Sequence, residues 1–128
     1  MTYYFSKTIE APFDKAVART RDALAKEGFG VISEVDVSKT LKSKIGVEFR
    51  PYLILGACNP ALAHEALKLE DKVGTMLPCN VVVQDAGGGR IEVAAIDPAA
   101  SMQAIDNAAL KNKAAEVGAK LQAALGHL

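Results

Sequence analysis

The residues best suited to chemistry are two cysteines, each of which stands directly before an asparagine. Cys58 lies in the run Gly56-Ala57-Cys58-Asn59-Pro60, where an apolar stretch ends. Asparagine is favoured at the N-cap of a helix and proline at the first helical position, so this run predicts a strand-to-helix turn. The free N–H groups and the positive dipole end at a helix start stabilise negative charge. A thiol in that place is suited to act as a nucleophile, a metal ligand or part of an anion site.

Cys79 lies in a second run of this kind, Leu77-Pro78-Cys79-Asn80-Val81, at the predicted start of a strand. Two Cys-Asn pairs in one short chain suggest two thiols that meet in space. If segment 72–78 returns extended after the intervening helix, the thiols approach each other. If it is compact, we expect them at opposite ends of the sheet. A disulfide needs Cα atoms within about 7 Å, so only the extended case permits one.

Each candidate also has a simpler interpretation. Cys58 is equally suited to be a small buried residue at a tight turn. His64 would add a third ligand for zinc or copper, but the spacing matches no standard metal motif and a helix-surface position explains it. We therefore predict no metal site, and no cofactor is assigned. Tyr52 is either a neighbour of the site or a core residue with its hydroxyl at the rim. The predicted ligand-binding residues are Gly56, Cys58, Asn59, Tyr52, Cys79 and Asn80, and Cys58 and Cys79 would carry any catalysis.

The elements that must position these residues follow from periodicity and caps. Alternation predicts strands, and apolar side chains three or four apart predict helices. The expected strands are 3–9, 29–35, 52–57, 80–84 and 90–96. The expected helices run from Pro12 to a Gly28 cap, from an Asp36 cap to 44, over 60–69, from the Asp97-Pro98 pair, and over 107–125.

The resulting order is β-α-β-(α)-β-α-β-β-α. It predicts an α+β fold in which a single, mostly antiparallel sheet of about five strands carries two long helices on one face. The other face of such a sheet stays open to solvent. An open sheet face favours association, so we expect a homodimer.

Composition limits the classes of function. The 128 residues suit one domain over 1–128. The 15 basic and 15 acidic side chains cancel, which argues against nucleic-acid binding. No apolar segment reaches the roughly 20 residues of a membrane span, and the N-terminus shows no secretory pattern. With only two cysteines, we expect reduced thiols and a cytoplasmic location.

The same motifs carry a resemblance that spans most of the chain, from the first helix to the turn before the last one. The sequence resembles the bacterial family catalogued as domain of unknown function 302. The resemblance implies an α+β fold with a TATA-binding-protein-like arrangement, and dimers. It implies no activity. The residues that carry it are Phe29-Gly30-Val31, Glu34-Val35-Asp36-Val37, Leu41-Lys42, Tyr52 to Pro60, Leu62-Ala63, Leu77 to Val83 and Ile96-Asp97-Pro98.

Three hypotheses about function follow. The first is a dimeric module that binds a small molecule or an anion at the turn Gly56–Pro60. The second is a thiol-based redox protein or enzyme that uses Cys58, with Cys79 as the resolving thiol. The third is a structural or interaction subunit in which both Cys-Asn pairs only build turns.

Overall fold

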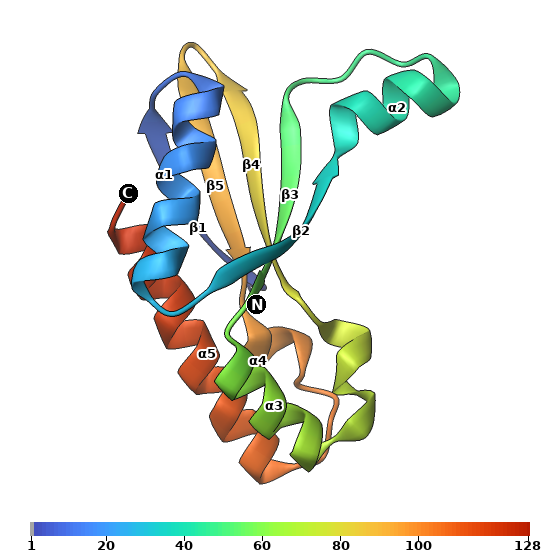
Figure 1. Cartoon of the computed structure of the whole chain (residues 1–128), viewed down its shortest axis with the longest axis vertical. Coiled ribbons are helices and arrows are strands. Elements are labelled where there is room, and N and C mark those ends of the chain that lie inside the picture. The colour runs from blue at the N-terminus through green and yellow to red at the C-terminus, as the bar shows by residue number, and fades with distance from the viewer. Residues whose placement is uncertain (1) are drawn as a thin grey trace.

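A computed structural model describes residues 2–128 and has one five-stranded sheet at its centre (Figure 1). The strand order is β1-β5-β4-β3-β2, and every neighbouring pair is antiparallel. The strands are β1 (Tyr4–Glu10), β2 (Gly30–Asp36), β3 (Tyr52–Cys58), β4 (Cys79–Gly87) and β5 (Arg90–Ile96). The predicted fold class is confirmed.

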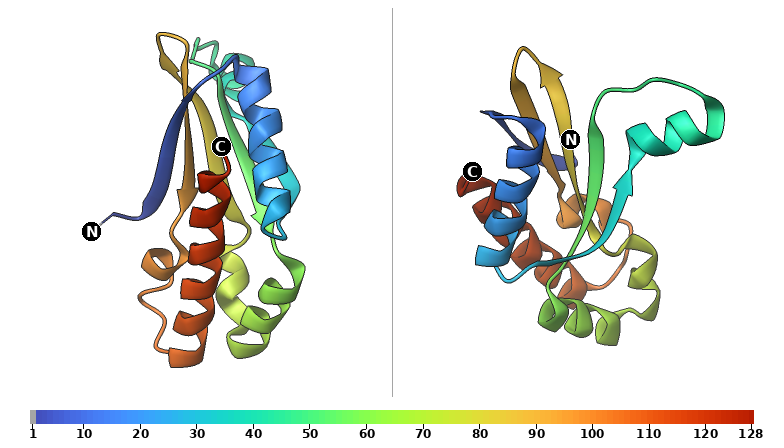
Figure 2. Two further views of the ribbon diagram at one scale, coloured as in Figure 1. Left: turned by 90° about the vertical axis from the view of Figure 1, so that its left-hand side faces the viewer. Right: turned by 45° about the horizontal axis from the view of Figure 1, so that its top comes forward.

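Two long helices, α1 (Phe13–Lys26) and α5 (Ala108–Gly126), lie side by side on one face of this sheet (Figure 2). Alternate side chains of the central strands point toward them, so the core forms between the two layers. Fully buried residues at this interface include Leu55, Val81 and Val93 from the sheet, with Leu24 and Leu121 from the helices. Among residues 2–128, no helix of this length lies on the other face, as the sequence pattern predicts (Figure 2).

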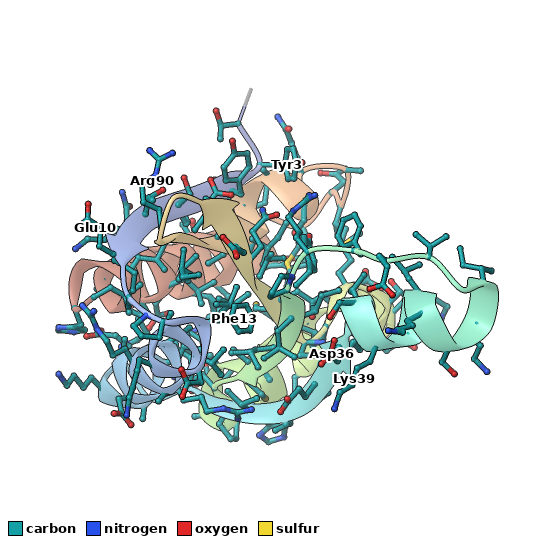
Figure 3. All side chains as sticks on the ribbon, turned by 90° about the horizontal axis from the view of Figure 1, so that it is seen from above. Tyr3, Glu10, Phe13, Asp36, Lys39 and Arg90 are labelled. Carbon is teal, nitrogen blue, oxygen red and sulfur yellow. The ribbon has the colours of Figure 1, made fainter. Side chains whose placement is uncertain are left out.

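Side-chain caps set where four of the helices begin. Asp36 caps α2 (Val37–Ile45), and its carboxylate accepts a hydrogen bond from the Lys39 N–H at 3.0 Å; Figure 3 shows the two residues together. Asn59 caps α3 (Pro60–Leu69), Asp97 caps α4 (Pro98–Ser101) and Asn107 caps α5. Each cap satisfies an N–H group that the first turn of a helix leaves without a partner. These starts agree with those predicted from Asp, Asn and Pro in the sequence.

The segment before β4 is compact. Residues Asp71–Met76 form the short 3₁₀ helix η1, yet β3 and β4 pair so that Ala57 stands opposite Cys79. The expectation that a compact segment would place the cysteines at opposite ends of the sheet was therefore wrong. An antiparallel partner must start where the preceding strand ends, whatever conformation the connection adopts.

Candidate ligand-binding site

An apolar cavity of about 370 Å³ lies where β3 ends and β4 begins. Residues of both Cys-Asn runs line it. Helices α3, α4 and α5 and the 3₁₀ helix η1 form its other walls. In volume it corresponds to about twelve water molecules and falls in the range of small-molecule sites. The lining consists of Phe29, Ile32, Ala57, Cys58, Asn59, Leu62, Ala63, Ala66, Leu67, Gly74, Leu77, Pro78, Cys79, Pro98, Met102, Leu110, Lys113, Ala114 and Val117.

The cavity exists because α5 is longer than the sheet it covers. The C-terminal half of α5 packs on the strands through Leu121 and Leu125. Its N-terminal half instead joins a second apolar cluster, through Leu110 and Ala114, with Val73 of η1. Helix α5 therefore contributes residues to both clusters, one cluster at each half of its length. Residues of both clusters line the cavity, which therefore lies between them.

The structure brings three of the predicted site residues to this cavity: Cys58, Asn59 and Cys79 all line it. Gly56 lies two residues before Cys58 on β3 and is buried. A Cβ at this position would stand 2.0 Å from Ser33 Oγ and 2.7 Å from Pro78 Cγ, so only glycine lets these segments approach. Gly56 therefore shapes the wall without contributing a side chain.

Tyr52 and Asn80 lie outside the cavity. Tyr52 is at the opposite end of β3, where its ring is 6.0 Å from that of Phe49. Asn80 pairs with Gly56 across the strands and its side chain is exposed. His64 is also exposed, and within residues 2–128 no three His, Cys, Asp or Glu side chains come close enough to hold a metal ion.

The helical half of the lining was not predicted from the sequence. Leu62, Met102, Leu110 and Val117 have the spacing of ordinary core residues. An apolar residue in a cavity wall and one in a packed core give the same pattern in a sequence, because both face away from water. The Asp97-Pro98 pair correctly marked the start of α4, but it gave no sign that this helix borders a cavity.

Lys113 is the one charged residue in the lining, and two carboxylates hold it. Its ammonium group pairs with Glu65 of α3 and with Glu116 of α5, the latter at 3.4 Å. These hydrogen bonds raise the pKa of Lys113. The bond between Lys113 and Glu65 also lowers the pKa of Glu65. The charge at this edge of the cavity is therefore already balanced by the protein itself.

Cys79 adds no charge either. Burial raises the pKa of its thiol from 9.0 to about 11, and the nearby Cys58 contributes in the same direction. The thiol is therefore protonated at neutral pH and is a poor nucleophile. This weakens the hypothesis in which Cys79 resolves a disulfide. Both cysteines are free thiols in the structure.

Asn59, next to Cys58, is the polar uncharged residue in the lining, and it caps α3. The side-chain oxygen of Asn59 accepts a bond from the Leu62 N–H at 3.3 Å. Its Nδ2 group finds no acceptor among the residues that the structure describes. This group lies beside Gly28, 3.0 Å from where a Cβ on that residue would stand, and both Asn59 and Cys58 are partly buried.

Comparison with known proteins identifies the family. The model of the family named domain of unknown function DUF302 matches residues 5–128, and the chain belongs to this family. The crystal structure of uncharacterized conserved protein DUF302 from Bacillus stearothermophilus is similar at 29% identity, with a TM-score of 0.91. The match covers 99% of this chain and 98% of that one. No match was found among curated proteins.

The helices in the described part of the chain are either too short or too polar to cross a membrane.

Proposed function

We propose that this protein binds a small, uncharged and mostly apolar molecule in the cavity beside the turn Gly56–Pro60. The observation that carries this proposal is an apolar space of about 370 Å³ whose lining includes the partly buried residues Cys58 and Asn59. Ligand sites typically combine apolar walls with a small number of polar groups that orient the ligand. The helix start alone would suggest an anion, but the neutral, apolar walls favour an uncharged ligand.

A tryptophan that fills the cavity tests this function. Ala63 lines the cavity from α3, whereas Ala61 is exposed on the same helix and lies outside it. We expect octanol, titrated in calorimetry, to bind the natural protein. Ala63→Trp should weaken the affinity by about tenfold or more, and Ala61→Trp should change it by less than about twofold. Absence of octanol binding to the natural protein, or equal loss in both variants, would contradict the proposal and favour a purely structural role.

We further propose that the protein is a homodimer whose second copy covers the arm formed by residues 37–51. Helix α2 in this arm has no buried residue and projects away from the other helices (Figure 1). An isolated helix this short is marginal in water, so contacts with a partner would stabilise it. Large apolar side chains stay exposed here, among them Ile45 at 67% and Val47 at 43%.

Sedimentation equilibrium of two charge variants tests the dimer. Ile45→Lys places a charge on the arm, and Leu69→Lys places one at another exposed apolar position, on α3. We expect the natural protein and Leu69→Lys to sediment as dimers and Ile45→Lys to dissociate, because a lone charge in an interface is costly to desolvate. A monomeric natural protein would contradict this proposal without affecting the one for the cavity.

The two free thiols favour a reducing compartment, and we therefore propose a cytoplasmic location.

A further inference from the structure

The cavity opens to solvent, and the side chains at its opening are apolar. Among the described residues of its lining, three are exposed: Ile32 of β2, Leu67 of α3 and Gly74 of η1. Ile32 is 66% exposed and Leu67 is 43% exposed, so two large aliphatic side chains line the cavity and also face water. Exposed apolar side chains that continue a ligand-sized space mark part of a binding surface. We call these three residues the cavity mouth.

A β-bulge places Ile32 at the mouth. Val31 pairs with Ala57 and Ser33 pairs with the preceding residue of β3, Gly56, so Ile32 is an extra residue between two paired ones. A bulge of this kind re-aims a side chain and is common beside functional sites. The residues on either side make other contacts, because Val31 packs against the main core and Ser33 lies against Gly56. The extra residue of the strand is therefore the one that lines the cavity.

A glycine keeps the aliphatic surface of Leu67 open at the same mouth. A Cβ on Gly74 would stand 4.0 Å from Leu67 Cδ2, which is an ordinary van der Waals contact. The φ angle of Gly74 is not positive, so its backbone conformation does not require glycine. A larger residue at position 74 would cover Leu67, whereas glycine leaves this surface free for a ligand.

The volume and the mouth together define the shape of the ligand. A methylene group takes up about as much space as a water molecule, so about 370 Å³ holds a chain of roughly twelve such groups. A ligand contained in the cavity would leave Ile32 and Leu67 in water. A ligand that also covers them must be longer than the cavity and apolar where it crosses the mouth. The walls suit an alkyl chain, because Leu62, Met102 and Leu110 offer flexible aliphatic surface.

We propose, on the basis of the binding function above, that the ligand is an unbranched single-chain amphiphile with an uncharged head and an alkyl chain longer than the cavity. The end of the chain lies among the apolar walls, the chain crosses the mouth over Ile32 and Leu67, and the head stays in water. The head then needs no partner in the cavity, where Lys113 is already paired with Glu65 and Glu116. Ile32 and Leu67 are the residues that determine specificity for chain length.

Equilibrium dialysis with radiolabelled octanol and tetradecanol, below the solubility limit of each, tests this inference. Octanol fits inside the cavity and tetradecanol exceeds it. Burial of one methylene strengthens binding by about fourfold, so tetradecanol should bind the natural protein at least about tenfold more tightly than octanol. Ile32→Ser and Leu67→Ser should each weaken tetradecanol binding by about fivefold or more, and change octanol binding by less than about twofold, because they remove aliphatic surface only at the mouth.

Val35→Ser on β2 and Leu69→Ser on α3 are the matched controls. Both residues are exposed, at 47% and 38%, and lie outside the cavity lining, so these variants should bind both alcohols as the natural protein does.

Different results separate this inference from the binding function. If octanol binds and tetradecanol binds less than about tenfold more tightly, the inference is overturned and cavity binding stands. If the mouth variants lose no more tetradecanol affinity than their controls, or lose octanol affinity equally, the mouth does not determine chain length and the inference is overturned as well. If neither alcohol binds the natural protein, the binding function fails and this inference fails with it.

Discussion

At the scale of the residue, Cys79 combines a reactive atom with an environment that suppresses its reactivity. The side chain is 6% exposed, between the sheet core and the cavity. Desolvation disfavours the thiolate, which raises the pKa of Cys79 to about 11. Cys79 therefore behaves as a small apolar wall residue at neutral pH, and the partly exposed Cys58 is left as the accessible thiol.

This raised pKa predicts a loss of stability at alkaline pH. From 9.0, the ordinary value, to about 11, the native state retains a proton on Cys79 that the unfolded state releases. Stability contributed by this group is fully present below pH 9 and falls as the pH rises toward 11. Two pKa units correspond to about 2–3 kcal/mol in the free energy of unfolding.

The measurement is urea unfolding at about pH 8 and about pH 10.5, for the natural protein and for Cys79→Ala. Lysines and tyrosines also titrate in this range, and both proteins share that effect. The natural protein should therefore lose more stability than the variant between the two pH values. An equal loss in both would show that Cys79 does not resist ionisation.

At the scale of the element, helix caps do more here than start helices. Asn107 accepts a hydrogen bond from the Leu110 N–H at 3.0 Å, which caps α5. Its Nδ2 group also donates to the carbonyl of Leu69 at 3.0 Å, at the end of α3. One side chain thus ties the first turn of α5 to the last turn of α3. Both helices contribute residues to the cavity lining, so this side chain helps to hold two parts of the cavity wall together.

Substitutions at Asn107 distinguish the capping hydrogen bond from the hydrogen bond to the Leu69 carbonyl. Asn107→Ala should reduce the free energy of unfolding by about 1–2 kcal/mol, because both bonds are lost. Asn107→Ser keeps a capping oxygen but is too short to reach Leu69, so it should recover about half of that loss. Asn112→Ala, at an exposed position on the same helix, should stay within about 0.5 kcal/mol of the natural protein. Equal unfolding free energies for the Ala and Ser variants in urea would contradict a contribution from the cap.

At the scale of the whole molecule, the chain combines a rigid body with a protruding arm. The sheet, α1 and α5 share one continuous core, whereas α2 and the following segment to Pro51 contribute no buried side chain. Regions with little burial open at low free-energy cost. The arm should therefore be the first part of the fold to lose its backbone hydrogen bonds.

Amide hydrogen exchange tests this difference together with the dimer. We expect the amides of α2 to exchange faster than those of β4 and β5 at low protein concentration. At higher concentration a second copy would cover the arm and slow its exchange, while β4 and β5 would stay unchanged. Exchange of α2 that is independent of concentration would contradict the assignment of the arm to the dimer interface.

Local signals in the sequence were sufficient for the elements and for half of the site. Asp36, Asn59 and Asp97 mark helix starts because each supplies the oxygen that a first turn lacks, and this depends only on neighbouring residues. The alternating and helical patterns likewise indicated a single antiparallel sheet with two covering helices. The Cys-Asn runs marked Cys58, Asn59 and Cys79 as residues worth examining for chemistry, but they left open whether the two thiols lie close together.

What only the tertiary structure decided is the cavity and the fate of each thiol. The pairing of Ala57 with Cys79 brings the two runs together, and the helical walls come from residues up to Val117 that are distant along the chain. A pKa depends on how much water and charge surround a group, and these surroundings are assembled from segments that the sequence does not mark as neighbours. Capping and periodicity act over a few residues and can be read from the sequence, whereas burial and the shape of a void exist only once distant elements have packed.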